Sequence, residues 1–303
     1  MGKGHHMPID NTNLVIADSE IRYLRSAHVG DEFKLFIAHP LFPLEPDQRV
    51  PVVYALDGNF SFGTVAETAR QLMMSRDMGQ CYVVGIGYRK NSAPEAAAIR
   101  CRDLTPARSP KFEEAFPKVM AMFGGQAPVT TGGGPQFLRF LVEELKLYIE
   151  AHFPVDPHDS TLAGLSFGGL FATYTLLNEP SAFQRYIICS PSLLYENEHI
   201  FAHEAAYAAQ HRDLDARVFL TCGALESESE SLAAIEKMPP AVKASLIQLW
   251  RPRMVELLEP FAERLRQRAY PSLKLTSHVF PGEHHNSVYP SAISRGLRVV
   301  FAK

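Results

Sequence analysis

Short apolar runs alternate with segments of helical spacing along most of the chain, and this alternation is what most constrains its fold. The runs are rich in β-branched and aromatic residues, which is typical of strands buried on both faces of a sheet. They occupy residues 50–56, 81–88, 160–166, 183–193 and 216–226, and helical patterns such as 62–76 and 167–180 lie between them. Strand and helix in alternation predict one mostly parallel sheet with helices on both faces.

The remaining segments fit around this sheet. Two β-like stretches within 14–38 predict an antiparallel edge, and 136–153 has the pattern of a long amphipathic helix. We expect a single α/β domain over 8–303. Residues 91–135 are rich in Pro, Ala and Gly and are predicted to form a long loop excursion. The helical stretch at 231–260 is an insertion, which we interpret either as a lid or as a helix packed on the sheet.

Composition and charge exclude several classes of protein. Hydrophobic residues make up 46% and charged residues 21%, as in an ordinary folded domain. A formal net charge of −3 without a long Lys/Arg cluster argues against nucleic acid, and no apolar run is long enough to span a membrane. The four cysteines lack paired spacing, and no secretory signal is apparent, so we expect a cytoplasmic protein. Residues 1–7, with a His pair between two methionines, resemble an expression-tag remnant.

Ser166 stands between Gly164 and Gly168, at the end of one apolar run and the start of a helical one. This G-x-S-x-G pattern between a strand and a helix is the signature of a nucleophile elbow. Residues without Cβ permit the sharp turn and let the serine oxygen project into a cleft. The bare pattern also fits a glycine-rich turn, but its place in the βαβ series favours a nucleophile.

A serine nucleophile needs a base and usually an orienting carboxylate, which follow it in the order acid, histidine. His284 and His285 both lie in the loop between the last predicted strand and helix, and we favour His285. His278 lies inside that strand, where a structural role is expected. Glu226, just after 216–223, is the candidate acid; the alternative is that its acidic stretch is only a solvated turn.

The oxyanion of such a reaction is stabilised by two backbone N–H groups. We expect one from Phe167, directly after the serine, and the other from Asn59 or Phe60 in the turn after 50–56. Neighbouring histidines make poor joint metal ligands, and no convincing phosphate-binding loop occurs. We therefore expect no metal and no cofactor.

With these residues in place, the chain resembles the esterase-D-like branch of the α/β-hydrolases, in particular the siderophore esterases that hydrolyse the trilactones enterobactin and salmochelin. The similar segments cover most of residues 30–300, and the block 132–177 is the most specific of them. The resemblance implies an α/β-hydrolase fold; the helical insertion at 231–260, expected near the active site, departs from the compact members of the family. The resemblance also implies a serine esterase that forms an acyl-enzyme on Ser166. The family's Pro-Gly-x-x-His loop supports His285 as the base, whereas dyad members of the family leave the role of Glu226 open.

For the substrate we prefer esters of small to moderate size, and thus a general carboxylesterase acting on a small molecule. A siderophore trilactone esterase and an acyltransferase of the same family are the alternatives. A protein that only binds ligands would lack one of the catalytic residues, all of which have candidates here. Ferric catecholates are strongly anionic, so their hydrolysis would favour a basic pocket, for which Arg89, Arg100 and Arg102 are available. The candidate substrate contacts are Arg102, Phe60, Tyr195 and Trp250; the oligomeric state is left open.

Overall fold

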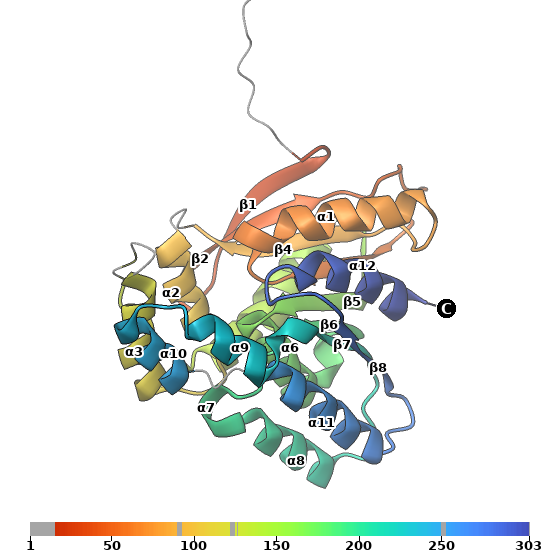
Figure 1. Ribbon diagram of the computed structural model, residues 1–303. Coiled ribbons are helices and arrows are strands. Elements are labelled where there is room, and N and C mark those ends of the chain that lie inside the picture. The colour runs from red at the N-terminus through yellow and green to blue at the C-terminus, as the bar shows by residue number, and fades with distance from the viewer. Residues whose placement is uncertain (1–15, 90–92, 122–124, 126, 250–252, 303) are drawn as a thin grey trace, which may run out of the picture.

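The computed structural model describes residues 16–89, 93–121, 125, 127–249 and 253–302. The expected tag remnant at 1–7 and Trp250 lie outside these residues. Within them the strands form one sheet in the order β1-β2-β4-β3-β5-β6-β7-β8, seen in Figure 1. Their bounds are β1(Ser19–Arg25), β2(Glu32–Ala38), β3(Val50–Ala55), β4(Tyr82–Tyr88), β5(Val155–Leu165), β6(Arg185–Cys189), β7(Arg217–Gly223) and β8(Lys274–Phe280). The first two strands pair antiparallel with each other, and β2 pairs antiparallel with β4. All other pairs are parallel, as the alternating pattern predicts.

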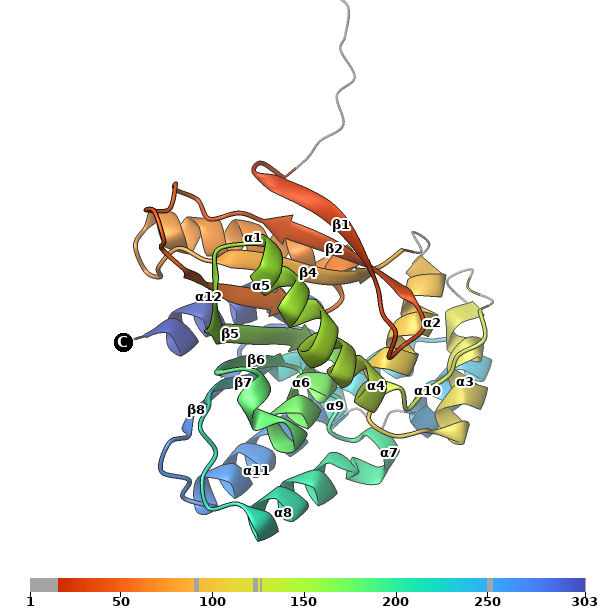
Figure 2. The ribbon, with the colours of Figure 1, turned by 180° about the vertical axis from the view of Figure 1, so that it is seen from behind.

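Each face of the sheet has its own core because successive side chains of a strand point to opposite faces. Val53 and Ala163 face α1(Gly58–Met74) and α12(Val288–Phe301), which lie side by side in Figure 1. Tyr54 and Leu162, one residue along on the same strands, face the larger core on the other side. Figure 2 shows the helices of that side. They include α5(Lys146–His152), α6(Phe167–Asn178), α8(Ile200–Gln210) and α11(Met254–Gln267).

The predicted loop excursion at 91–135 is wrong in one respect, because most of it is helical. It contains α2(Ala93–Asp103) and α3(Pro110–Met120), and α4(Gly134–Arg139) begins at its end. Ser109 caps α3 by accepting a hydrogen bond from the amide of Phe112 at 3.2 Å, and Pro110 occupies the first turn. Phe112, Phe116 and Val119 are buried at helical spacing. The Pro and Gly residues between these short helices hid that spacing.

The predicted helix at 136–153 is helical but not uniform: α4 passes through a π-helical turn, η2(Phe140–Leu145), into α5. The insertion at 231–260 spans the end of α9(Glu228–Ile235), α10(Pro240–Leu249) and the start of α11. Helix α10 packs against α3 and α9, as Figure 1 also shows. Within the insertion α10 therefore packs mainly on other helices, whereas α11 packs on β7 and β8 of the sheet. The short helices α7(Tyr195–Glu198), η3(Pro180–Ala182) and η4(Ala224–Glu226) connect the remaining elements.

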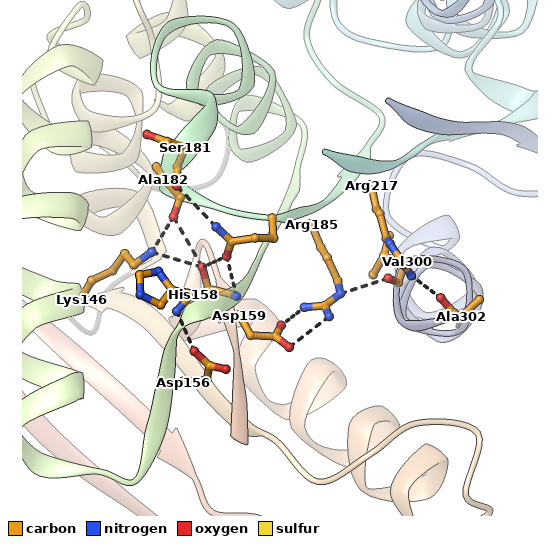
Figure 3. Close-up of polar contacts among 12 residues, drawn as sticks. Lys146, Asp156, His158, Asp159, Ser181, Ala182, Arg185, Arg217, Val300 and Ala302 are labelled. Carbon is orange, nitrogen blue, oxygen red and sulfur yellow. Dashed lines mark hydrogen bonds and ion pairs between the residues drawn. The ribbon is translucent and has the colours of Figure 1, made fainter. Parts of the chain in front are cut away.

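A polar network fixes the ends of strands β5, β6 and β7 opposite the nucleophile (Figure 3). Arg185 forms a two-pronged ion pair with Asp159 and donates through Nε to the carbonyl of Val300 at 3.1 Å. Arg217 donates to the carbonyl of Ala302. These carbonyls at the C-terminal end of α12 have no acceptor role within the helix, so both guanidinium groups satisfy them and complement the helix dipole. The network ties α12 to the sheet. The loop that carries His285 directly precedes α12 and is therefore held at the sheet as well.

Candidate active site

Ser166 lies at the turn from β5 into α6 with φ 63° and ψ −116°, a conformation that non-glycine residues rarely adopt. At the neighbouring glycines the surrounding backbone leaves no room for a side chain. A Cβ on Gly164 would lie 2.4 Å from the carbonyl carbon of Gly168, and one on Gly169 would lie 2.7 Å from the carbonyl oxygen of Cys189. The amide of Ser166 donates to that Cys189 oxygen at 3.0 Å, which holds the turn. The turn thus has the strained geometry of a nucleophile elbow.

His285 and Glu226, which are 59 positions apart in the sequence, meet in the structure. The loop between β8 and α12 carries His285, and η4 directly after β7 carries Glu226. Nδ1 of His285 lies 2.5 Å from Oε2 of Glu226, whose side chain is only 6% exposed. Because an ionised carboxylate only accepts hydrogen bonds, Nδ1 bears the proton and Nε2 is left as a base.

Two further groups hold the Glu226 carboxylate. The Ser190 hydroxyl donates to Oε1 at 2.6 Å, and the amide of Gly223 donates to the same oxygen at 2.7 Å. Burial by itself raises the pKa of Glu226, but the hydrogen bonds from His285, Ser190 and Gly223 outweigh it and lower the pKa below its ordinary value. The acid is therefore ionised where it contacts the imidazole. Sequence reasoning assigned no role to Ser190, although it begins the segment "SPSL" directly after β6.

The other two histidines considered from the sequence make different contacts, although His284 also lines one of the cavities at Ser166. His284 is exposed, and its amide donates to the Ser287 hydroxyl at 2.9 Å. His278, within β8, lies 3.0 Å from Nη1 of Arg295, and burial together with that cation lowers its pKa. Among the described histidines, only His285 contacts a buried carboxylate.

Two cavities open on either side of Ser166 and share Ser166, His285 and Arg100. The first, which we call the α12 cavity, has a volume of about 500 Å³ and is completed by Leu56, Asp57, Phe60, Ser61, Thr64, Leu165, Asn286, Tyr289 and Pro290. The second, the α9 cavity, has a volume of about 370 Å³ and is completed by Phe116, Phe167, Ser192, Leu225, Glu226, Glu230, Ser231, Ala234, Ile235, Leu246, Met254 and His284. A bound molecule can therefore extend away from the serine in two directions.

The amides predicted for oxyanion binding lie at two helix N-termini. Phe167 is the first residue of α6, where N–H groups have no intrahelical acceptor. Asn59 lies in the first turn of α1, and its side chain makes two hydrogen bonds to the backbone of Tyr88, at 3.0 and 2.6 Å. These bonds fasten the turn to β4. The amide of Phe60 already donates to the carbonyl of Asp57 at 2.8 Å, so Asn59 is the better candidate of the two.

Arg100 is the only basic side chain among the described lining residues, leaving histidines aside, and it is not free. Its Nε and Nη2 donate to the two carboxylate oxygens of Asp57 at 2.8 and 2.9 Å, and its guanidinium lies 5.5 Å from the ring centre of Phe167. Burial opposes its charge, but Asp57 more than compensates and raises the pKa of Arg100. The pair links α2, the turn before α1 and the elbow.

The predicted substrate contacts separate into those near the serine and those away from it. Phe60, with 60% of its surface exposed, lines the α12 cavity. Arg102 lines neither cavity; it pairs with Asp103 and Asp31 and anchors the segment after α2. Tyr195 also lines neither cavity. It is buried against Phe167, and its hydroxyl donates to the carbonyl of Ala107 at 2.8 Å, so it packs the core behind the elbow.

The parallel sheet, the elbow serine and the carboxylate–imidazole pair define a serine hydrolase of the α/β-hydrolase class. A family model described as "Putative esterase" matches residues 26–299, so the chain belongs to this esterase family. The ferri-bacillibactin esterase BesA of Bacillus subtilis is 30% identical over 93% of this chain and 89% of its own length. The siderophore triacetylfusarinine C esterase of Aspergillus fumigatus is 28% identical over 96% of this chain and 95% of its own.

Solved structures agree with this assignment. The BES protein from Bacillus cereus superposes with a TM-score of 0.76 at 28% identity, and the match covers 98% of this chain and 100% of that one. The chain is accordingly an ester hydrolase of a family that includes siderophore esterases. No helix within the described ranges is both long and apolar enough to cross a membrane.

Proposed function

We propose that the protein hydrolyses ester bonds of a siderophore through an acyl-enzyme on Ser166. The observation that carries the proposal is the hydrogen bond between His285 and the buried, ionised Glu226, beside a serine in elbow geometry. This arrangement supports a nucleophile, a base and an acid, the three groups that a serine esterase requires, each from a separate loop.

The proposed reaction starts when Oγ of Ser166 attacks the ester carbonyl carbon while Nε2 of His285 takes the hydroxyl proton. The amides of Phe167 and Asn59 stabilise the negative charge on the carbonyl oxygen. The proton then passes from His285 to the alkoxide oxygen, the alcohol leaves, and the acyl group remains on Ser166. A water molecule activated by His285 attacks the acyl-enzyme and releases the acid. Glu226 orients the imidazole and stabilises its cationic form throughout.

Two observations favour a siderophore over the small esters preferred from the sequence. The α12 and α9 cavities flank the serine on both sides, which suits an ester inside a larger molecule rather than one at its end. The relatives that cover nearly the whole chain are named as esterases of bacillibactin and of triacetylfusarinine C.

We further propose that α9 and α10 act as a lid. Residues of both helices line the α9 cavity, and α10 rests on α3 instead of the sheet.

The test compares the wild type with Ser166→Ala on p-nitrophenyl acetate, butyrate and octanoate, and on a cyclic trilactone with and without iron. We expect the trilactone to be opened with a higher kcat/KM than the acetate ester, and all turnover to disappear in the variant. Intact-mass spectrometry during turnover should show one acyl adduct in the wild type alone. Turnover retained in Ser166→Ala would refute the proposal.

Acyl transfer to an alcohol is the rival within the same fold. It is separated by adding an alcohol acceptor and measuring the ratio of ester to free acid among the products. A product that is mostly free acid supports hydrolysis.

A further inference from the structure

Resting on the proposed function, we propose that the site selects esters with no net negative charge near the scissile bond. An electroneutral siderophore ester, such as a ferric trihydroxamate, would then be preferred to a trianionic ferric tricatecholate. The inference comes from the charges that line the two cavities around Ser166.

The described residues of the two cavities include three carboxylates and one guanidinium. Asp57 and Arg100 neutralise each other through two hydrogen bonds, so this pair presents no net charge to a substrate. Glu226 is ionised and buried against His285. Glu230 is exposed on α9, on the wall of the α9 cavity, and no hydrogen bond or ion pair of its carboxylate occurs among the described residues. The described lining residues thus bring more negative than positive charge to the two cavities.

Arg100 is paired with Asp57, and the other two arginines that the sequence offers for a basic pocket, Arg89 and Arg102, are used elsewhere. Arg102 is bound by Asp103 and Asp31, and Arg89 is paired with Glu32. Arg108 is paired with Glu113. None of these three lines a cavity that contains Ser166. The described part of the chain therefore has no unpaired cation placed to neutralise an anionic substrate at the serine.

The charge of a ferric siderophore follows from its donor groups. A catecholate brings two negative charges and a hydroxamate one, so iron(III) with three catecholates is a trianion and iron(III) with three hydroxamates is neutral. Like charges at a partly enclosed site repel each other, and the repulsion at the exposed Glu230 is weakened by solvent. Hydrolysis of the neutral complex should consequently be favoured at this site. The apolar side chains of the α9 cavity, among them Phe116, Ile235 and Met254, suit the same uncharged class.

A matched pair of chromogenic esters isolates charge from size. The p-nitrophenyl butyrate ester and the p-nitrophenyl hemisuccinate ester have acyl chains of the same carbon number, and only the second carries a carboxylate. We expect kcat/KM for the neutral ester to exceed that for the anionic one by about tenfold or more at low salt, and the ratio to shrink as salt screens the repulsion. A wild type that shows no preference, or prefers the anion, overturns the proposal.

Charge variants locate the effect. Glu230→Lys should lower the neutral-to-anionic ratio at least about threefold, because it replaces the exposed carboxylate by a cation at the same place. Glu228→Lys is the matched control: it makes the same charge change on the same helix, but Glu228 lines neither cavity. Equal effects of both variants would show a general charge effect and overturn the assignment to the site.

Competition between a ferric trihydroxamate ester and a ferric tricatecholate trilactone completes the test, with product acids measured by mass spectrometry. Preferential hydrolysis of the trihydroxamate supports the proposal, and preferential hydrolysis of the tricatecholate overturns it. Failure of the proposed function is distinguishable, since the enzyme would then act on none of these esters or would act equally well as Ser166→Ala.

Discussion

The hydroxyl of Ser190 donates a hydrogen bond to Oε1 of Glu226 at 2.6 Å, while Nδ1 of His285 contacts Oε2 of the same carboxylate at 2.5 Å. Ser190 is fully buried and has φ 41°, an unfavourable value for a residue with a side chain. Backbone strain of this kind persists only where the surroundings enforce it. We therefore propose that Ser190 is a positioning residue, which fixes the rotation of the carboxylate that we propose orients the base.

Ser190→Ala removes this donor and leaves Glu226 with two of its three hydrogen bonds. A hydrogen bond to a charged group contributes about 1.5–3 kcal/mol, so we expect kcat/KM to fall roughly tenfold or more. The pKa of Glu226 should rise, so activity should be lost at a higher pH than in the wild type as the solution is acidified. Ser26→Ala, an equally buried serine in the turn between β1 and β2, is the control. Identical pH–rate profiles for all three proteins would contradict the positioning role.

The base is tested by comparing two neighbouring histidines. His285→Ala should lower kcat by roughly a thousandfold or more, since it removes the only described imidazole paired with a buried carboxylate. His284→Ala should change kcat by less than about threefold, because that side chain is exposed and lies outside the proton path. Steady-state kinetics with p-nitrophenyl butyrate decide the matter. The opposite ranking would make His284 the base.

Glu226→Gln tests whether the site is a triad or a dyad. The amide keeps the shape of the carboxyl group but can favour the wrong tautomer of His285, and such an exchange costs about 10⁴-fold in kcat in the serine protease triad. We expect a loss of at least about a hundredfold here. Circular dichroism and thermal unfolding serve as the check on folding. Turnover close to that of the wild type would mean that Ser166 and His285 work as a dyad.

The same carboxyl group makes stability depend on pH in a definite direction. The pKa of Glu226 is lower in the folded protein than the ordinary value of 4.5. The unfolded chain therefore binds the proton more readily. The stabilisation is complete above about pH 4.5 and is lost as the pH falls through the folded-state pKa. Urea unfolding from pH 7 to pH 3.5 should show a steeper loss of unfolding free energy in the wild type than in Glu226→Gln. Parallel curves would contradict the lowered pKa.

Much of this site could be predicted because its signals are local in sequence. The elbow depends on glycines within two residues of Ser166, and the chain order of a βαβ series determines which loops reach the carboxyl ends of the strands. Glu226 and His285 follow β7 and β8 for that reason, and the structure joins them by a hydrogen bond. The buried strands alternating with helices likewise predicted the parallel sheet, and the two β-like stretches within 14–38 predicted its antiparallel edge.

What could not be predicted depends on contacts between distant segments. Ser190 resembles any serine after a strand until its 2.6 Å contact with Glu226 is known. Arg102 was a candidate for substrate binding because its charge is visible in sequence, whereas its partner Asp31 lies 71 positions away. Helix α3 was missed since its apolar face is only three turns long and is bordered by Pro and Gly. Tertiary packing against α10 stabilises it.

The lid proposal is tested with two adjacent alanines of α9. Ala234 lines the α9 cavity and Ala233 does not, yet both are exposed on the same helix. Ala234→Phe should narrow the cavity and lower kcat/KM for p-nitrophenyl octanoate or a trilactone by about tenfold, while the acetate ester is affected by less than about twofold, because the small acyl group does not reach α9. Ala233→Phe adds the same bulk to the outer surface and should leave the ratio of octanoate to acetate turnover unchanged. If both variants lowered all esters equally, α9 would contribute to stability alone and the substrate would have to lie in the α12 cavity.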